Sequence, residues 1–189
     1  MAKIIGIVGS PRRKGNTEIL TKTALAAAAE AGAKTELITL AGKEIKPCDG
    51  CRRCREKQTD CHIKDDLPPI FHKILEADGL ILATPVYIGA ATAQVTALID
   101  RVYFWSGAYG RPLENKVGSP LVVARRAGQN FTFAQLIFFF YIAGMIIPGT
   151  TYWPIAFGRE KGEVVNDEEG MNTARNLGKK MAWLADKLK

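Results

Sequence analysis

The sequence has no cysteine outside one short stretch, only two histidines in 189 residues, and no internal repeat, low-complexity tract or linker. We therefore expect a single domain over residues 1–189, long enough to bury a core without disulfide bonds. Met1 leads directly into apolar residues with no cleavage site after them, and the apolar stretch Ala134–Ile147 is too short to span a membrane. These absences predict a cytoplasmic protein with no membrane partner, in which thiols stay reduced.

Alternating β and α patterns fill most of the chain. Short, continuous apolar runs predict strands buried on both faces of a parallel sheet, with helices between them. The expected strands are Ile4–Val8, Thr35–Leu40, Gly79–Ala83, Ser119–Ala124 and Met145–Thr151. The expected helices are Thr17–Ala31, a helix capped at Asp65 that ends at Glu76, Thr92–Val102, Phe131–Ala143 and Glu168–Leu188. This alternation predicts an α/β, doubly wound, five-stranded parallel sheet of flavodoxin-like order 2-1-3-4-5, with a cysteine-rich loop after strand 2.

A polar, basic loop follows the first expected strand. Residues 9–17 read Gly-Ser-Pro-Arg-Arg-Lys-Gly-Asn-Thr and lead into a helix, where backbone N–H groups and the helix dipole favour an anion. The loop lacks the Walker A lysine, and the G-x-G-x-x-G pattern and the acid that would hold an NAD ribose are also missing. A mononucleotide such as FMN fits this loop better than a dinucleotide. The alternative is an ordinary turn without a ligand.

All the cysteines lie in the loop 47–64, with the spacing C-x2-C-x2-C-x6-C: Cys48, Cys51, Cys54 and Cys61. Zinc sites usually pair two C-x2-C motifs a dozen or more residues apart, whereas three closely spaced cysteines with a fourth nearby suit a [4Fe–4S] cluster. Both histidines lie outside this spacing, so we expect ligation by cysteine alone. Zinc, a redox dithiol and an unmetallated loop remain alternatives.

Basic residues gather around the cysteines, in a chain whose net charge is +7. They would offset the negative charge of a thiolate-ligated cluster and dock an acidic electron carrier such as ferredoxin, or they form only a solvated surface. No aromatic residue interleaves with them, so we expect no nucleic acid partner. These residues are Lys43, Lys46, Arg52, Arg53, Arg55, Lys57 and Lys64.

Three motifs resemble those of a known family. Gly-Ser-Pro-Arg-x-x-Gly-Asn-Thr, Thr-Pro-Val-Tyr, and Asp-Glu-Glu-Gly before the last helix resemble the NAD(P)H-dependent FMN reductases. With the cysteine run, the chain is similar over nearly its whole length to the iron–sulfur flavoproteins of anaerobic archaea and bacteria. The resemblance implies an FMN phosphate held by Ser10, Arg12, Asn16 and Thr17. It implies an isoalloxazine ring lined by Pro85, Val86, Tyr87, Ile88, Ala127, Gly128 and Gln129. One departure is Arg125-Arg126, which begins a loop that is usually glycine-rich in the family.

The stretch Ala134–Ile147 is apolar on all sides, whereas a helix on the surface of a sheet should be apolar on one face. We expect a second copy of the chain to cover it, in a homo-oligomer (dimer or tetramer), with Trp105 and Tyr109 as further contacts. The alternative cover is the chain's own segment around Tyr152-Trp153.

The residues thus predict an FMN-dependent oxidoreductase in which electrons pass between a [4Fe–4S] cluster, FMN and an external partner such as ferredoxin or NAD(P)H. We see no side-chain nucleophile or acid–base pair, so no catalytic side chain is assigned. A second hypothesis is an NAD(P)H-dependent FMN or quinone reductase whose cysteines bind structural zinc or no metal. A third is a non-enzymatic electron carrier of the flavodoxin type, although such carriers are typically acidic.

Overall fold

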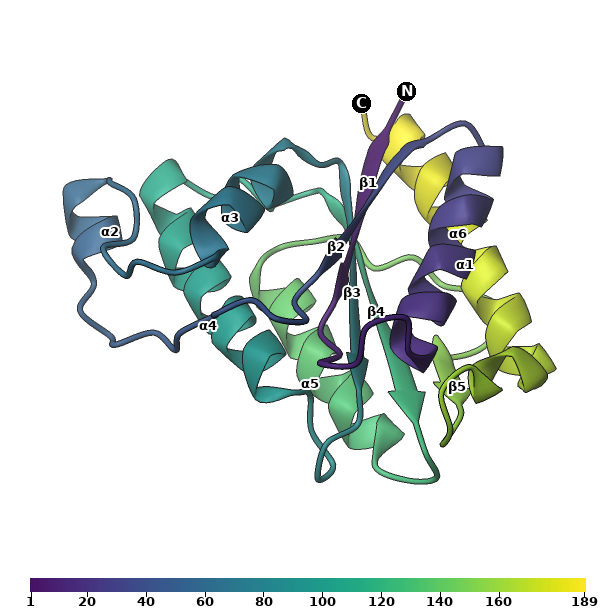
Figure 1. Cartoon of the computed structure of the whole chain (residues 1–189). Coiled ribbons are helices and arrows are strands. Elements are labelled where there is room, and N and C mark those ends of the chain that lie inside the picture. The colour runs from purple at the N-terminus through teal and green to yellow at the C-terminus, as the bar shows by residue number, and fades with distance from the viewer.

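One parallel sheet organises the chain, and the computed structural model describes all of residues 1–189. Its five strands follow the order β2-β1-β3-β4-β5 (Figure 1), which confirms the predicted fold class. The strands are β1 (Lys3–Val8), β2 (Lys34–Thr39), β3 (Gly79–Pro85), β4 (Val117–Ala124) and β5 (Ile155–Phe157). Because β1 lies between β2 and β3, the chain reverses its direction of winding there. The loops that leave β1 and β3 diverge and open a crevice at their carboxyl ends.

The helices cover the two faces of the sheet and enclose two separate cores. α1 (Asn16–Glu30) and α6 (Glu168–Lys187) pack side by side on one face, and α3 (Leu67–Glu76), α4 (Ala93–Ser106) and α5 (Gln129–Ile142) lie on the other (Figure 1). The remaining helical pieces are α2 (Arg53–Lys57), which the sequence did not predict, and two 3-10 turns, Gly107–Tyr109 and Glu163–Asn166. No helix combines the length and the apolar character needed to cross a membrane.

The fifth strand is not where the sequence predicted it. Of the segment Met145–Thr151, only Ile146 pairs with the sheet, through an isolated bridge to Val117, and the strand forms later, at β5. On this edge of β4 the N–H of Gly118 bonds to Ile146 O and that of Val122 to Pro154 O. Pro120 lies between them and has no N–H to donate, so the ladder is interrupted there.

The end of α4 is also longer and more buried than expected. Trp105 is only 1% exposed, and its ring stacks on Phe71 with the ring centroids 3.9 Å apart. Trp105 therefore belongs to the core between α3 and α4, and its predicted role as an oligomer contact is wrong. The reason is that the helix continues to Ser106, which turns this side chain inward.

Candidate functional site

A cavity of about 300 Å³ opens at the carboxyl ends of β1, β3 and β4, beside the loop after β5. It brings together four segments that are far apart in the sequence, as expected at the reversal point of a doubly wound sheet. Its lining residues are Ser10, Arg12, Gly15, Asn16, Thr17, Pro85, Val86, Tyr87, Val123, Arg125, Gly158, Arg159, Glu160 and Lys161.

The start of α1 forms one wall of this cavity. The amide groups of Asn16, Thr17 and Glu18 have no backbone acceptor, because the first helical bond joins the Ile19 N–H to Gly15 O. Thr17 is buried, and Ser10 is only 4% exposed. Free amide groups at a helix start, with the helix dipole behind them, form an anion site. This geometry fits the phosphate of a mononucleotide.

The two neighbouring arginines of the loop have different surroundings. Arg12 lines the cavity, and its backbone N–H donates to Ser10 Oγ at 3.2 Å. Arg13 turns away from the cavity and donates from Nη2 to Ala41 O at 3.2 Å. Of these two arginines, only Arg12 is therefore placed to contact an anion in the cavity.

The side chain of Asn16 holds a distant loop in place. Its Nδ2 donates to Glu160 O at 2.8 Å, and its Oδ1 accepts from Gly162 N at 2.8 Å. Both polar atoms of the amide are thus engaged within the protein. A contribution of Asn16 to phosphate binding would come from its backbone N–H, while its side chain fixes the segment Gly158–Lys161.

That segment is a part of the site that the sequence analysis missed. Arg159 and Lys161 line the cavity directly after β5 and add positive charge to that of Arg12 and Arg125. They were missed because the fifth strand was predicted too early in the chain, at Met145–Thr151, so that its end did not lie next to Arg159 and Lys161. The signal that was present is a short apolar run, Ile155–Phe157, followed by basic residues.

Two loops were expected to line a flavin ring, and only some of their residues line this cavity. Pro85, Val86 and Tyr87 line it, whereas Ile88, at φ 52°, is fully exposed and does not. Ala127 and Gly128 do not line it either. Gly128, at φ 85°, nevertheless lies so close to the loop after β3 that an added Cβ would be 2.9 Å from Val86 Cγ1.

A second cavity, of about 200 Å³, lies within the cysteine loop, next to the end of α4. The predicted metal ligands converge here, since every cysteine of the chain lines it as a free thiol. The lining residues are Cys48, Asp49, Gly50, Cys51, Arg52, Cys54, Arg55, Cys61, His62, Arg101, Phe104 and Trp105. The short helix α2, from Arg53 to Lys57, carries Cys54 into this cavity.

Like charges would accumulate at this second cavity if its thiols ionised. Burial raises the pKa of the Cys54 thiol, and repulsion from the other three cysteines adds to this rise. Several thiolates can share the space only if positive charge enters with them. An iron–sulfur cluster or a metal ion would supply that charge.

Arg101 of α4 supplies a fixed positive charge at the same place. It is 1% exposed, forms a buried ion pair with Asp65, and donates from Nη2 to Cys61 Sγ at 3.5 Å. Burial disfavours the charged form of both Asp65 and Arg101. Their ion pair and hydrogen bonds together outweigh this effect, so the pKa of Asp65 is lowered and the pKa of Arg101 is raised. The Nε of Arg101 has no hydrogen-bond partner. A buried donor without an acceptor fits an anionic group in this cavity.

His62 is closer to the cysteines than the spacing suggested. Its Nε2 lies 2.8 Å from Asp49 Oδ2, and possible ligand atoms of Asp49, Cys51 and His62 lie within 4.8 Å of one another. These three exposed side chains have the chemistry of a zinc site. The structure therefore keeps a mixed ligand set as an alternative to four cysteines.

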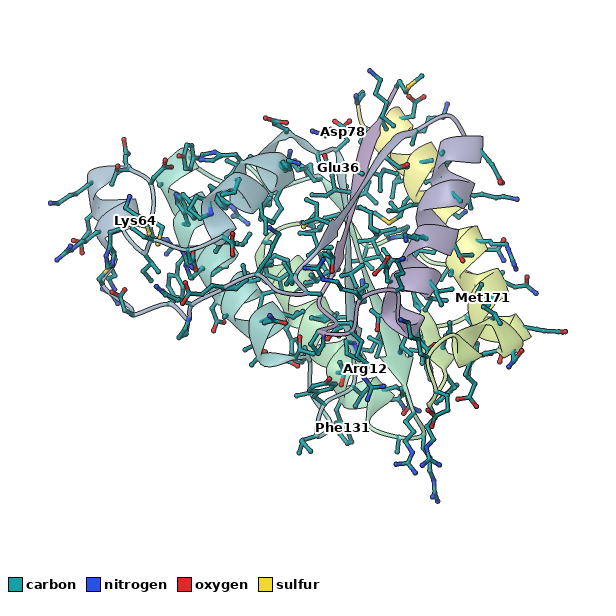
Figure 2. All side chains as sticks on the ribbon, viewed as in Figure 1. Arg12, Glu36, Lys64, Asp78, Phe131 and Met171 are labelled. Atoms are coloured by element: carbon teal, nitrogen blue, oxygen red, sulfur yellow. The ribbon has the colours of Figure 1, made fainter.

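The two cavities lie in different parts of the molecule and share no lining residue. Figure 2 shows Arg12 beneath the carboxyl ends of the strands and Lys64, within the cysteine loop, at the far side of the α3–α4 layer. Each cavity therefore has its own set of lining residues.

The strand order, with a phosphate-type cavity where β1 and β3 diverge, defines a flavodoxin-like α/β protein. A flavodoxin-type, WrbA-like protein of Agrobacterium tumefaciens has the same fold, with a TM-score of 0.68 and 17% identity over the whole of both chains.

Comparison with known sequences identifies the family. Residues 2–160 match the model of the NADPH-dependent FMN reductases. An iron–sulfur flavoprotein of Methanocaldococcus jannaschii is 44% identical, with 99% of each chain covered. One of Methanosarcina thermophila is 37% identical, with 95% of this chain and 93% of the relative covered. The chain belongs to the NADPH-dependent FMN reductase family, in the branch of the iron–sulfur flavoproteins, which confirms the resemblance seen in its motifs.

Proposed function

We propose that this chain is an FMN-dependent oxidoreductase that also holds a [4Fe–4S] cluster on Cys48, Cys51, Cys54 and Cys61. The observation that carries the proposal is the convergence of all these cysteines on one cavity, beside a buried arginine that donates to one of them. The names of the relatives, iron–sulfur flavoproteins, support the same assignment. The two cofactors are complementary, because FMN exchanges one or two electrons and the cluster exchanges one.

The chain's own residues would bind and orient the flavin. The amide groups at the start of α1, together with Ser10 and Arg12, neutralise the phosphate, and Thr17 closes this end of the cavity. Pro85, Val86 and Tyr87 line the space for the ring, and Ile88, Ala127 and Gly128 lie in the loops that flank it. No side chain is assigned a proton-transfer role, because the chemistry resides in the cofactors.

The external partner in this proposal is ferredoxin or NAD(P)H. Arg52, Arg53 and Lys57 are exposed on the cysteine loop, beside the cavity that would hold the cluster. An acidic electron carrier would be attracted to this surface, and the attraction would weaken as salt is added.

A homo-oligomer also belongs to the proposal. The flavin cavity and the cysteine cavity are separated within one chain, so a second copy that brings its cysteine loop to this flavin would shorten the path for electrons. The face of α5 supports such contacts, since Phe138 and Tyr141 are 70% and 81% exposed.

A second candidate is an NAD(P)H-dependent flavin or quinone reductase with structural zinc. The grouping of Asp49, Cys51 and His62 favours it, because their ligand atoms already lie within reach of one ion. In this case the cysteine loop would have a structural role and would take no part in electron transfer.

The test is an absorption spectrum of protein purified without oxygen, with iron, sulfide, zinc and FMN assayed on the same sample. We expect about four irons and four sulfides per chain, alongside one FMN. Cys61→Ser should lose iron and keep FMN, because the cavities share no residue. Stoichiometric zinc without sulfide would instead establish the second candidate.

A further inference from the structure

Arg101 contacts both ends of the cysteine loop from a single buried position. Its Nη1 donates to Lys46 O at 3.2 Å, before the first cysteine, and forms the ion pair with Asp65, after the last one. Its Nη2 donates to Ile63 O and to Cys61 Sγ, each at 3.5 Å. One side chain of α4 thus joins the segments on which the loop enters and leaves the fold.

The burial of the Arg101 side chain is not explained by its ion pair with Asp65 alone. Replacing a buried ion pair by well-packed apolar residues is often neutral or stabilising, so such a pair gives weak support to a fold. Arg101, which lines the cavity, also donates to the Cys61 thiol and to two loop carbonyls, and its buried Nε–H has no hydrogen-bond partner. The donor groups of Arg101 therefore serve several partners around the cysteine cavity, and Asp65 is only one of them.

We propose that Arg101 is a positioning residue for the cluster: it fixes Cys61 for ligation and raises the cluster's reduction potential by donating a hydrogen bond to that thiolate. The inference rests on the proposed function, because it requires a cluster. Reduction adds one electron, and hence one negative charge, to the cluster without breaking a bond to Cys61. A buried positive charge and a donor to the ligand sulfur stabilise this reduced form more than the oxidised one.

Arg55 offers a matched comparison within the same cavity. Its guanidinium is exposed, donates from Nε to Phe104 O at 3.3 Å, and lies 5.2 Å from the centre of the Phe104 ring. It makes no hydrogen bond to a cysteine sulfur. Because solvent screens an exposed charge, Arg55 should affect the cluster much less than Arg101 does.

The experiment compares wild type with Arg101→Met/Asp65→Asn, which removes the charge of both partners and leaves no unpaired buried ion. Asp65→Asn alone isolates the effect of the carboxylate, and Arg55→Met is the control for a nearby positive charge. Each protein is reconstituted with iron and sulfide without oxygen. Iron content is measured, and the cluster is titrated with dithionite and followed by electron paramagnetic resonance. Circular dichroism verifies folding.

We expect the double variant to fold and to shift the equilibrium between reduced and oxidised cluster at least tenfold toward the oxidised form, about 59 mV for one electron. Loss of iron from the folded double variant, with iron retained in Asp65→Asn, would also support the positioning role. Arg55→Met should keep its iron, with a shift below about threefold.

A double variant that binds full iron at the wild-type potential would overturn the inference. If it does not fold, Arg101→Lys, which keeps a charge for Asp65, is judged by the same criteria. If wild type itself binds no iron and sulfide, the proposed function fails first. The two failures are therefore distinguishable.

Discussion

At the scale of single residues, the phosphate loop shows how neighbouring side chains of one type divide their roles. Arg12 lines the cavity at the carboxyl ends of β1, β3 and β4, and Arg13 donates a hydrogen bond to the backbone of a neighbouring loop. The family motif had singled out Arg12, the arginine of this pair that lines the cavity. The commitment of the Asn16 amide to the loop after β5 was not predictable, because its partners lie more than 140 residues away.

Arg12→Ala should weaken FMN binding about tenfold to hundredfold, since a hydrogen bond to a charged group contributes about 1.5–3 kcal/mol. The measurement is fluorescence quenching on titration of the flavin-free protein with FMN. Arg13→Ala is the matched control and should change the dissociation constant by less than about twofold. Equal losses in both variants would mean that Arg12 has no specific contact with the phosphate.

Glu18 gives a prediction on pH. Its carboxylate accepts from Lys22 Nζ and from the Lys14 N–H, both at 2.6 Å, and chiefly the bond from Lys22 lowers the pKa of Glu18. The unfolded chain then binds the proton more tightly than the folded chain. The stabilisation is therefore present above the unfolded pKa, about 4.3, and is lost as the pH falls through the lower folded value.

Glu18→Gln should accordingly lower the free energy of unfolding by about 1 kcal/mol at pH 7. At a pH below the folded pKa the difference should vanish, because the protonated wild type resembles the variant. Urea denaturation at pH 7 and at a second pH below the folded pKa measures both values. Glu30→Gln, at the exposed end of the same helix, should stay within about 0.5 kcal/mol of wild type at either pH.

At the scale of elements, the type and order of most helices and strands followed from the sequence, and only β5 was misplaced. The continuous apolar runs of β1 and β3 predict buried strands because both faces of a parallel sheet are covered. The same reasoning failed for Met145–Thr151, in which the apolar run is only Met145–Ile147 and ends at Pro148. Whether an apolar segment joins a sheet depends on free backbone groups of the neighbouring strand, and Pro120 removes one of them.

The close contact of α1 with α6 requires a glycine. A Cβ added to Gly178 would lie 1.9 Å from Ala24 O, a backbone atom of α1. Helix propensity predicts that alanine at this position stabilises the helix by about 1 kcal/mol. We expect the opposite, a loss of about 1–3 kcal/mol, because the two helices would have to separate.

Urea denaturation of Gly178→Ala measures this loss. Lys179→Ala, next to it on the exposed side of α6, is the control and should stay within about 0.5 kcal/mol of wild type. A Gly178→Ala variant more stable than wild type would show that the helices adjust at no cost.

At the scale of the whole molecule, α5 leaves apolar surface without cover. Leu136, Phe139 and Phe140 pack on the sheet, while Phe138 and Tyr141 point outward. The alternative cover expected from Tyr152-Trp153 is wrong, because these residues are themselves more than half exposed. A second copy of the chain remains our proposal for this surface.

Wild type should therefore elute as a homo-oligomer in gel filtration at micromolar concentration, and Phe138→Glu should shift it toward the monomer. A charge in the centre of an apolar contact loses its hydration without a partner, which accounts for the shift. Trp183→Glu places the same charge on an exposed aromatic of α6, on the opposite face, and should leave the elution volume unchanged. A monomeric wild type would refute the proposed oligomer.

The sequence by itself determined the alternation of elements, the helix start that can bind a phosphate, and the compact set of cysteines, because each depends on residues adjacent in the chain. The tertiary structure decided which distant residues complete each cavity. Arg159 and Lys161 join the phosphate loop, and Arg101 joins Cys61 across 40 residues of sequence. These contacts depend on how helices pack on the sheet, and a local pattern carries no information about that packing.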